Sequence, residues 1–555
     1  MSETAAQSSS TLAHRLEIGR YAQPSELVED WHRRGLMSGQ RLGPSLAEVQ
    51  RQWPDRLAVV EGDVRLTYGE VARQAGALAT ALTAAGVGPG DVVSWQLPNW
   101  WEAYLLAAAT WQIGAVNNPI LTIYREHELR QILADLRPKA LFAPVTFRRT
   151  EHVELLESVL AEIGHQPELK VAVRDAAPGW QDFDALLRAR PTRTAFAGGG
   201  PDDPCVVAYT SGTTARAKGV VVGAAALLAE THQMRHSWGL GWGDRVFMPA
   251  PLAHLTGVCV GLTVPSLAGG AVVLTERWEP DAALEIIERE RCSISAGTPI
   301  FLEEIVSRYE QAGFDGGAAL RQFSVGGAAV PPSLVDRADA VGVGAFRCYG
   351  MTEHSSVTIA NAGLAVAIRR DTDGPVAPGT EVSCVDEDGA VLPQGVRGEI
   401  RVRGPERMLC YVDERDNASS LAPGEGWFAT GDIGAVDGEG RLTIMGRIKD
   451  IINRGGEKFS VREMEDLLAT HPDVRHVAVV PAPDERFGET PAAFVVTGDG
   501  SGAAPTPEQL AAFVEGAGLA RQKIPTIWRF VDELPRTPFG KVKKQELVRS
   551  LGEPA

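Results

Sequence analysis

The sequence predicts an α/β protein in which layered, mostly parallel sheets are followed by a small β-rich region and a second, smaller α/β unit. Three observations support this fold class. From about residue 46, short β-branched runs alternate with segments whose apolar residues recur at helical spacing. From residue 374 the strands become short and turn signals lie close together, which is typical of a small antiparallel sheet or β-barrel. Residues 446–458 are charged and glycine-rich, as expected at a joint between domains.

The first part of the chain contains the elements of a layered domain. Residues 1–45 are expected to form a mobile leader that runs into a first helix. Two β-branched runs around Gly62-Asp63 predict a hairpin, and the apolar spacing after it predicts a helix. The strands expected are 57–60, 64–68, 92–97 and 205–209, with helices over 68–85, 105–113 and 124–136.

The later elements repeat this alternation and then begin again near the C-terminus. The strands expected are 220–222, 245–248, 270–274, 293–296, 323–325, 474–480 and 492–497, with helices over 224–238, 461–470, 507–517 and 543–551. The last group is large enough for a small α/β unit of its own.

Composition and charge exclude several classes of protein. The chain is 44% hydrophobic and 23% charged, which is typical of a soluble globular protein, and its net charge of -17 argues against binding nucleic acid or an anionic membrane. The six cysteines are scattered without a Cys-x-x-Cys pair, so neither a zinc site nor a disulfide framework is expected. The polar N-terminus lacks a signal-peptide core, and no run reaches the ~18 apolar residues of a membrane span. We therefore expect a cytoplasmic protein.

A polar turn between two predicted strands carries the first functional signal. Residues 209–220 read Tyr-Thr-Ser-Gly-Thr-Thr-Ala-Arg-Ala-Lys-Gly-Val. Its backbone N–H groups and hydroxyls can donate to phosphate oxygens, and Lys218 supplies a point charge. An ordinary turn rich in Ser, Thr and Gly fits this stretch equally well. The P-loop NTPase pattern is excluded, because Ala217 replaces its second glycine and Gly219 follows the lysine.

Five further segments stand in a recognisable order. They are Val325-Gly-Gly-Ala-Ala329, Arg347-Cys-Tyr-Gly-Met-Thr-Glu353, Phe428-Ala-Thr-Gly-Asp432, residues 446–458 and Leu534-Pro-Arg-Thr-Pro-Phe-Gly-Lys541. With the loop, they resemble the motifs of the adenylate-forming superfamily, which includes acyl-CoA ligases, firefly luciferase and nonribosomal-peptide adenylation domains. The resemblance runs from about residue 46 to 548. It implies the adenylate-forming enzyme fold, with an N-terminal AMP-binding domain over 1–446, a hinge over 447–450 and a mobile C-terminal domain over 451–555.

The resemblance also implies a nucleotide site. Tyr349 would stack on adenine, Thr352 would contact the α-phosphate, and Glu353 would hold Mg²⁺, since a carboxylate beside a polyphosphate requires a cation between them. Asp432 and Arg447 would bind the ribose, the aspartate by accepting two hydrogen bonds. The other residues implied in nucleotide binding are Thr210, Ser211, Gly212, Thr213, Thr214, Gly326, Gly327, Ala328, Gly350 and Met351, and Lys218 is implied as a catalytic residue.

The resemblance assigns further residues to the two half-reactions. Lys541 matches the lysine that neutralises charge while a carboxylate attacks the α-phosphate, and Lys449 lies at the pivot of the C-terminal domain. Gly455 and Gly456 match the pair that lines the pantetheine channel for CoA. His254 matches the histidine near the acyl carboxylate and the thiol path, although a lone histidine between apolar residues also fits a hydrogen-bonded core position.

Within the superfamily, residues 96–101, 118–120 and 124–128 are most similar to bacterial ligases of cyclohexanecarboxylate and medium-chain acids. The expected reaction joins CoA to a hydrophobic, alicyclic or polycyclic carboxylic acid through acyl-AMP. Peptide-synthetase adenylation domains normally continue into a carrier domain, so a sequence ending at Ala555 favours a CoA ligase. The acyl pocket is expected at the segments around His232, His254 and Gly326.

The loop departs from the family pattern at two positions. Ala215 stands where the family has its second glycine, and Ala217 where it has proline. If the glycine position requires φ > 0, an L-residue there costs about 1–2 kcal/mol, and losing the proline leaves the loop more entropy to lose on ordering. We therefore expect adenylation, which must hold the departing pyrophosphate, to be impaired, while thioesterification of acyl-AMP is spared. A partner ligase would then supply the adenylate.

Three alternatives stay open at this point. The first is a complete ATP-dependent ligase that works despite its loop, which the presence of Lys541 and Glu353 favours. The second is a non-catalytic adenylate-binding protein, which thioester formation from acyl-AMP would exclude. The third is a monooxygenating relative of luciferase, which the similarity to CoA ligases disfavours.

Overall fold

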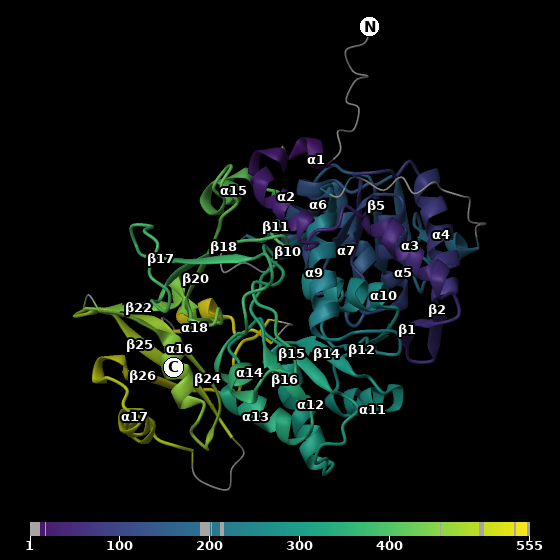
Figure 1. Cartoon of the computed structure of the whole chain (residues 1–555). Coiled ribbons are helices and arrows are strands. Elements are labelled where there is room, and N and C mark those ends of the chain that lie inside the picture. The colour runs from purple at the N-terminus through teal and green to yellow at the C-terminus, as the bar shows by residue number, and fades with distance from the viewer. Residues whose placement is uncertain are drawn as a thin grey trace.

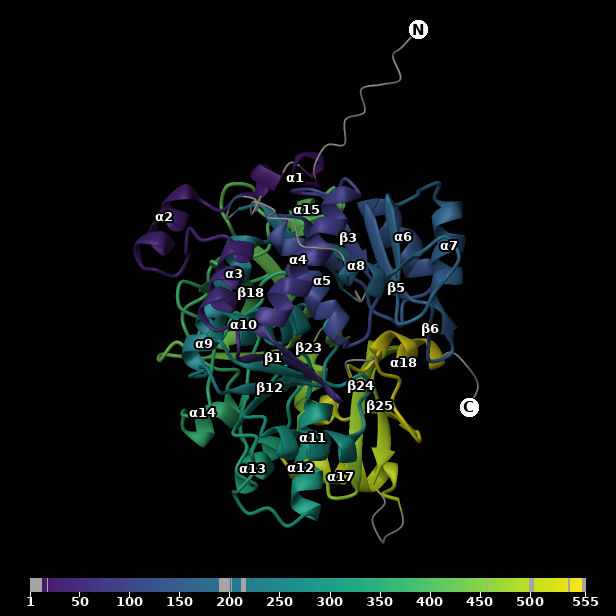
Figure 2. The ribbon, with the colours of Figure 1, turned by 90° about the vertical axis from the view of Figure 1, so that its right-hand side faces the viewer.

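The structure is a computed structural model that describes residues 12–16, 18–188, 200, 202–210, 216–455, 457–498, 504–537 and 540–551. The chain forms a large N-terminal part and a small C-terminal part, each mixed α/β (Figure 1). In Figure 1 and in the perpendicular view of Figure 2, the yellow C-terminal elements lie against the lower half of the N-terminal part. The expected division into a large and a small α/β domain is confirmed.

One sheet holds the strands that flank the predicted phosphate loop. It has eight strands in the order β19-β11-β10-β4-β3-β5-β8-β9, parallel from β10 to β9 and antiparallel at β10–β11 and β11–β19. Every residue of β5 is buried, as expected for a parallel strand covered on both faces. The strands are β3 (Val92–Trp95), β4 (Val116–Pro119), β5 (Ala140–Pro144), β8 (Leu169–Val173), β9 (Gln181–Asp182), β10 (Pro204–Thr210), β11 (Lys218–Gly223) and β19 (Cys410–Tyr411).

A second sheet carries two of the predicted motifs at its strand ends. Its seven strands follow the order β16-β15-β14-β12-β13-β1-β2, and all neighbours are parallel except the β1–β2 hairpin. The strands are β1 (Leu57–Glu61), β2 (Val64–Thr67), β12 (Arg245–Met248), β13 (Ala271–Leu274), β14 (Ile294–Gly297), β15 (Gln322–Val325) and β16 (Gly344–Arg347). The ends of β15 and β16 lead into the segments around Gly326 and Tyr349, where parallel sheets commonly bind ligands.

Helices cover these two sheets. Helix α4 begins where the Thr67 hydroxyl accepts from the Glu70 N–H at 3.2 Å, while the Glu70 carboxylate accepts from the Thr67 N–H at 2.8 Å, which is a capping box. The helices of the N-terminal part are α1 (Leu12–Arg15), α2 (Ser25–Arg33), α3 (Leu42–Gln52), α4 (Tyr68–Ala84), α5 (Trp101–Gln112), α6 (Glu126–Leu136), α7 (His152–Glu162), α8 (Phe183–Leu187), α9 (Ala224–Ser237), α10 (Val264–Ala268), α11 (Pro280–Glu290), α12 (Pro299–Gln311), α13 (Pro332–Ala340), α14 (Val366–Asp371) and α15 (Glu414–Ser420). A short β6 (Thr146–Phe147) and β7 (Thr150–Glu151) hairpin, the 3-10 turn η1 (Ile18–Tyr21) and the π-helical η2 (Gly257–Thr263) complete it.

The β-rich region after residue 374 is an open antiparallel sheet. Its order is β17-β18-β20-β21, and residues 374–447 are all described, so β17 and β21 are its two edges. The strands are β17 (Glu381–Val385), β18 (Gly398–Arg403), β20 (Phe428–Val436) and β21 (Leu442–Arg447). Of the two expectations, the sheet is confirmed and the barrel is wrong, because four strands are too few to close around a core.

The expected leader over 1–45 is wrong from Ile18 onward. Trp31 is 2% exposed and donates its indole N–H to the Gly379 carbonyl at 3.1 Å. The Tyr21 hydroxyl donates to Glu414 at 2.6 Å. Composition alone did not reveal these anchors, since a single tryptophan among polar residues gives no helical period.

The C-terminal part is built on its own sheet. β23 (Glu457–Ser460), β22 (Ile451–Arg454), β25 (Gly488–Thr497) and β24 (Val474–Asp484) are antiparallel neighbours, and β26 (Ile527–Phe530) adds to β25 in parallel. Helices α16 (Val461–Leu468), α17 (Pro507–Gly516) and α18 (Lys544–Ser550) pack on it, with 3-10 turns η3 (Ile448–Asp450) and η4 (Arg521–Lys523). Its core is separate from that of the N-terminal part, as in an independent domain.

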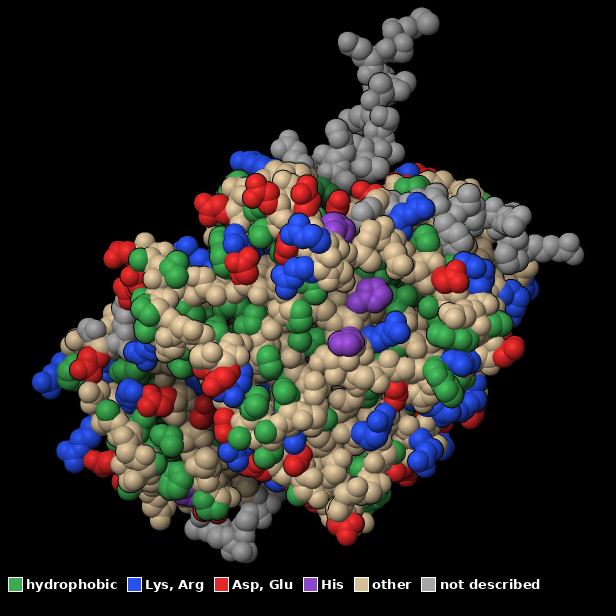
Figure 3. All heavy atoms as spheres, viewed as in Figure 1, with side chains coloured by type: hydrophobic (Ala, Val, Ile, Leu, Met, Phe, Trp, Pro, Cys, Tyr) green, Lys and Arg blue, Asp and Glu red, His purple; other side chains and the backbone are tan. Residues whose placement is uncertain are grey.

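The surface carries charges of both signs. On the face shown in Figure 3, acidic and basic side chains are interspersed. This face therefore has no large positive patch that would attract a polyanion. The six cysteines are unpaired and buried or half-buried. Among the described residues, no helix combines the length and apolar character needed to cross a membrane.

Candidate active site

Tyr349, Asp432 and Arg447 meet at one corner of the N-terminal part. Asp432 on β20 pairs directly with Arg447 at the end of β21, and Tyr349 follows β16. The Tyr349 hydroxyl donates to Asp432 Oδ2 at 2.6 Å, and Arg447 Nε lies 3.0 Å from Asp432 Oδ1. Burial, together with the Asp432 carboxylate, raises the pKa of Tyr349 well above its ordinary value. Three residues that the sequence predicts at adenine and ribose are therefore in contact.

Lys541 reaches the same corner from the C-terminal part. Burial lowers the pKa of its ammonium group to about 8; the charge of Arg447 adds to this shift, while Asp432 and Asp450 oppose it. The preceding turn is closed by the Thr537 N–H, which donates to the Lys541 carbonyl at 2.7 Å. A lysine held here can stabilise negative charge that develops next to the ribose.

The turn that presents Lys541 packs closely on the N-terminal part. Gly540 has a φ of +76°, and a Cβ there would lie 2.6 Å from Ile300 Cγ2 on α12. Glycine meets both constraints, because it tolerates positive φ and lacks the Cβ. A larger residue at position 540 would therefore disturb the packing of this turn on α12.

The lowered pKa of Lys541 sets an expected pH limit for adenylation. The ammonium form stabilises the transition state, so kcat/KM for ATP should fall about tenfold per pH unit above the free-enzyme pKa of about 8. Thioester formation from supplied acyl-AMP should not follow this fall. Pyrophosphate release measured from about pH 6.5 to about pH 9.5 tests it. Lys541→Arg is the control, because a guanidinium stays charged and should flatten the profile; a flat wild-type profile would contradict the expectation.

His254, which the sequence predicts near the acyl carboxylate, is half-buried and lies within electrostatic range of Lys541. It follows β12 and precedes η2, and its Nδ1 lies 3.3 Å from both the Thr256 amide and hydroxyl. Burial, and then the charge of Lys541, lowers the pKa of the His254 imidazole to about 4. A neutral imidazole beside Lys541 can form a hydrogen bond without adding a positive charge.

Small residues allow two strand ends to approach each other. A Cβ on Gly326 would lie 2.8 Å from both the carbonyl oxygen and the Sγ of Cys348. Gly327 has a φ of +77°, and half-buried Ala328 follows it. A Cβ on Gly350 would collide with a main-chain carbonyl of the next turn. Glycine is therefore required at positions 326, 327 and 350 by the packing and backbone conformation of the protein itself.

Glu353 stands at the tip of a turn. Met351 and His354 form an isolated bridge, so that Thr352 and Glu353 lie between them with partly exposed side chains. The Tyr411 hydroxyl donates to Glu353 Oε1 at 2.7 Å. The described residues contain no group of three or more His, Cys, Asp or Glu side chains suited to a metal. A lone carboxylate still fits Mg²⁺, which is commonly held by one or two carboxylates together with substrate phosphates and water.

The base of the phosphate loop lies beside Glu353. Thr210 ends β10 directly opposite Lys218, which begins β11. Lys218 Nζ lies 3.1 Å from Asp416 Oδ1 and 4.8 Å from the centre of the Tyr411 ring, and the same ring carries the hydroxyl bound to Glu353. The loop residues Ser211, Gly212, Thr213, Thr214 and Ala215 lie outside the described residues.

The end of the loop is anchored without a proline. The Ala217 carbonyl accepts a hydrogen bond from Gln131 Nε2 at 2.7 Å. Arg216 forms an ion pair with Asp413 and lies 3.6 Å from Asp135. These contacts hold the segment that the proline of the family pattern would stiffen.

The residues predicted at the hinge and in CoA binding lie on other elements. Lys449 is in η3 between β21 and β22. Gly455 turns β22 into β23 with a φ of +62°, and its N–H donates to the Phe487 carbonyl at 2.8 Å, within the C-terminal sheet. Gly456 lies outside the described residues. Their predicted roles in rotation and CoA binding stay predictions.

His232 lies on the helix beside the segment that follows His254. It is half-buried on α9, and burial, followed by the charge of Arg235, lowers its pKa. Helix α9 meets η2 through the hydroxyls of Thr231 and Thr263, 2.7 Å apart. This neighbourhood fits the predicted acyl pocket.

Sequence reasoning missed two features of this region. Glu230 on α9 is 1% exposed. The signal was a charged residue at the end of the otherwise apolar run Ala224-Ala-Ala-Leu-Leu-Ala-Glu230, a position where helical spacing predicts a core residue. The sequence around Tyr411 gives no comparable signal, because the contacts of Tyr411 with Glu353 and Lys218 form only when β19 pairs with β11.

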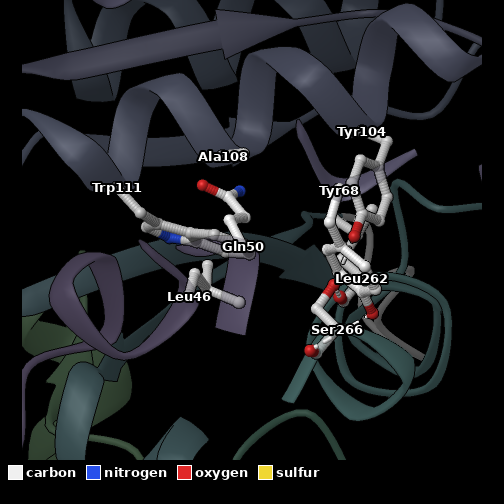
Figure 4. A pocket seen from close by; sticks show the side chains of 8 residues that line it. All are labelled: Leu46, Gln50, Tyr68, Tyr104, Ala108, Trp111, Leu262 and Ser266. Carbon is white, nitrogen blue, oxygen red and sulfur yellow. Dashed lines mark hydrogen bonds between the residues drawn. The ribbon is translucent and has the colours of Figure 1, made fainter. Parts of the chain in front are cut away.

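A small cavity lies between α3, α5 and α10 (Figure 4). It has room for about one water molecule. The Tyr68 hydroxyl beside it donates to the Gly270 carbonyl at 2.6 Å. The cavity is a packing gap apart from the site above, lined by Leu46, Gln50, Tyr68, Tyr104, Ala108, Trp111, Leu262 and Ser266.

Comparisons with known proteins agree with this geometry. The AMP-binding enzyme family matches residues 46–412, and the AMP-binding enzyme C-terminal domain matches residues 463–541. The medium-chain fatty-acid–CoA ligase of Escherichia coli is 33% identical over 521 residues, covering 93% of this chain and 91% of that protein. A feruloyl-CoA synthase of Amycolatopsis sp is 33% identical over 519 residues, covering 93% and 100%. The crystal structure of ATP-bound MatB from Rhodopseudomonas palustris has a TM-score of 0.81 at 27% identity, covering 92% and 99%.

The family match spans more than half of the chain, and the relatives are covered over nearly their whole length. The resemblance inferred from the motifs is confirmed for the superfamily, the fold and the class of enzyme. The chain therefore belongs to the AMP-binding enzyme family and is an acid–thiol ligase of the AMP-forming acyl-CoA synthetase type, which joins an acid to CoA through acyl-AMP.

Proposed function

We propose that this ligase acts on a hydrophobic carboxylic acid and that its adenylation half-reaction is slower than its thioesterification. The observation that carries the ligase function is Lys541, held among Arg447, Asp432 and His254. The hydrophobic acid is supported by the names of the relatives, which act on medium-chain fatty acids and on ferulate. An apolar segment around His254, with Ala253 and Leu255 buried, is consistent with such a substrate.

The residues present suit both half-reactions. In the first, a carboxylate oxygen attacks the α-phosphorus of ATP and the bond to pyrophosphate breaks, while Lys541 stabilises the charge that develops. In the second, the CoA sulfur attacks the acyl carbon, the bond to AMP breaks, and the thiol proton is lost to a base. Glu353 would hold Mg²⁺, which when bound neutralises phosphate charge. Neutral His254 would contact the acyl carboxylate.

A slow first half-reaction is supported by the loop substitutions. Ala215 replaces a family glycine and Ala217 a family proline. Lys218 and Arg216 are moreover already paired with Asp416 and Asp413, so phosphate must compete with these carboxylates. In the strongest form of this proposal, the enzyme uses acyl-AMP supplied by a partner ligase. The relatives' names favour the alternative, a complete ligase that adenylates at an ordinary rate.

Restoring the family loop should accelerate adenylation. Ala215→Gly combined with Ala217→Pro is expected to raise pyrophosphate release by about 10-fold or more, because displacement of a phosphate clamp by ~1 Å can cost about 10²-fold in rate. Thioester formation from prepared acyl-AMP should change less than about threefold. The assay compares ATP–Mg²⁺ with acyl-AMP, using decanoate and cyclohexanecarboxylate as acids.

The two routes also separate the alternatives. Equal rates from ATP and acyl-AMP in the wild type, with no gain in the double variant, would establish the complete ligase and refute the loop argument. Product from acyl-AMP alone would establish the need for a partner ligase. No thioester by either route, despite adenylate binding, would point to a non-catalytic adenylate-binding protein and refute the proposed function.

A further inference from the structure

Glu230 has a buried carboxyl group, and only one of its two oxygens forms a hydrogen bond with the described residues. It lies on α9 and is 1% exposed. The Ser356 hydroxyl donates to Glu230 Oε1 at 2.8 Å, whereas Oε2 has no hydrogen-bond partner among the described residues. A buried polar atom without a partner costs stability, so its presence calls for a reason outside packing.

Glu230 lies where the segments of the acyl site converge. Ser356 follows the turn that carries Glu353, three residues earlier in the chain. Cys259 is on η2, which begins shortly after His254, and the charge of Glu230 raises the pKa of the Cys259 thiol after burial has done so. Glu230 therefore contacts the segment that follows Glu353 and lies within electrostatic range of η2.

The strand-end segment is close as well. Glu230 contributes to the raised pKa of Cys348, after burial and Asp373. The same Cys348 is the neighbour that a Cβ on Gly326 would touch at 2.8 Å. Glu230 is thus within electrostatic reach of the segments around Gly326 and His254, two of the three segments expected to form the acyl pocket, and close to the turn that carries Glu353.

A second buried carboxyl group, that of Glu406, differs from Glu230 because both of its oxygens accept hydrogen bonds. It accepts from Gln233 and from the Thr380 hydroxyl. Burial, and then the proximity of Glu230, raises the pKa of Glu406 well above its ordinary value.

Burial raises the pKa of Glu230 to about 7, so near neutral pH a large share of Glu230 carries its proton. Such a group can donate an O–H as well as accept, and it has no full charge to neutralise.

We propose that Glu230 Oε2 hydrogen-bonds a neutral oxygen, a carbonyl or a hydroxyl, at the end of the acyl group remote from its carboxylate. The substrate class would then be a hydrophobic acid that carries a distal oxygen. This inference rests on the proposed function of the site as an acyl-CoA ligase. A site built around a buried polar group rejects an analogue that lacks the matching atom, because the group is then left unpaired. Glu230 is in this sense a specificity-determining residue.

Matched pairs of acids test the proposal in the full-length protein. Cyclohexanecarboxylate is compared with 4-oxocyclohexanecarboxylate, and decanoate with 10-hydroxydecanoate, each as the free acid with ATP–Mg²⁺ and as prepared acyl-AMP. The wild type should prefer the oxygenated member by about 10-fold or more in kcat/KM. Glu230→Gln, whose amide still donates and accepts, should keep the preference, and Glu230→Leu should abolish or reverse it.

Two results would overturn the proposal: equal use of both members by the wild type, or a preference unchanged in Glu230→Leu. A preference for 4-aminocyclohexanecarboxylate would also overturn it, because Glu230 would then act as an anion that pairs with a cation. If no acid yields thioester by either route, the ligase function fails instead.

Thermal unfolding decides the role of Glu230 without any substrate. If the carboxyl group is kept for a ligand, Glu230→Gln should leave the Tm nearly unchanged, because its amide oxygen still accepts from Ser356, whereas Glu230→Leu also removes that hydrogen bond. A clear fall in Tm for both Glu230→Leu and Glu230→Gln would show that the carboxyl group serves packing, and would overturn the proposal.

Discussion

Lys541→Ala should lower ATP-dependent thioester formation by about 10²–10³-fold, while thioester formation from supplied acyl-AMP changes less than about threefold. The two half-reactions should differ because of where Lys541 lies. Lys541 lies in the field of Asp432, Arg447 and His254, where adenylation develops charge on the α-phosphate. Thioesterification develops its charge at the acyl carbonyl and releases no pyrophosphate. Pyrophosphate release and CoA-thioester formation, measured separately, check the two half-reactions.

Lys543→Ala is the matched control. Its ammonium group is partly exposed and lies 2.9 Å from the Glu546 carboxylate, within the same C-terminal segment, so both half-reactions should keep wild-type rates. A loss of similar size from ATP and from acyl-AMP in Lys541→Ala would contradict the assignment. It would show that Lys541 supports the fold or binds the shared AMP group.

Asp432→Asn should weaken both routes, unlike Lys541→Ala. The Asp432 carboxylate accepts from Tyr349 and pairs with Arg447, and we expect it to exchange these partners for the ribose hydroxyls. An amide has one acceptor oxygen and no charge, and a hydrogen bond to a charged group contributes about 1.5–3 kcal/mol. Since ATP and acyl-AMP share the ribose, kcat/KM should fall by about 10²-fold for each.

Asp437→Asn controls for the loss of a carboxylate on the same sheet. Asp437 forms an ion pair with Arg441 at 2.7 Å in the turn between β20 and β21, so both routes should keep their rates. If Asp432→Asn slows only the ATP route, its carboxylate does not serve the ribose. Isothermal calorimetry with AMP then separates weaker binding from slower chemistry.

Part of the site was visible in the sequence because its motifs are local. The tyrosine of the 347–353 motif, Asp432, Arg447 and Lys541 each sit in a short run whose composition and order match the family, and the structure brings them to one corner. The fold class was equally visible, since alternating strand and helix periods require layered sheets. The predictions of a leader and of a barrel were wrong because the true arrangement depends on long-range contacts, such as that of Trp31 with Gly379. Such contacts produce no periodic pattern in the local sequence.

The sequence by itself determined the family and the order of the elements and predicted the side chains of the candidate site, because these depend on residue types and their spacing. Only the tertiary structure decided their electrostatic state. Burial in a shared corner brings the pKa of Lys541 to about 8 and that of His254 to about 4. Folding likewise leaves one oxygen of the Glu230 carboxyl group without a hydrogen-bond partner among the described residues. Desolvation depends on every atom packed around a group, and those atoms come from segments far apart along the chain.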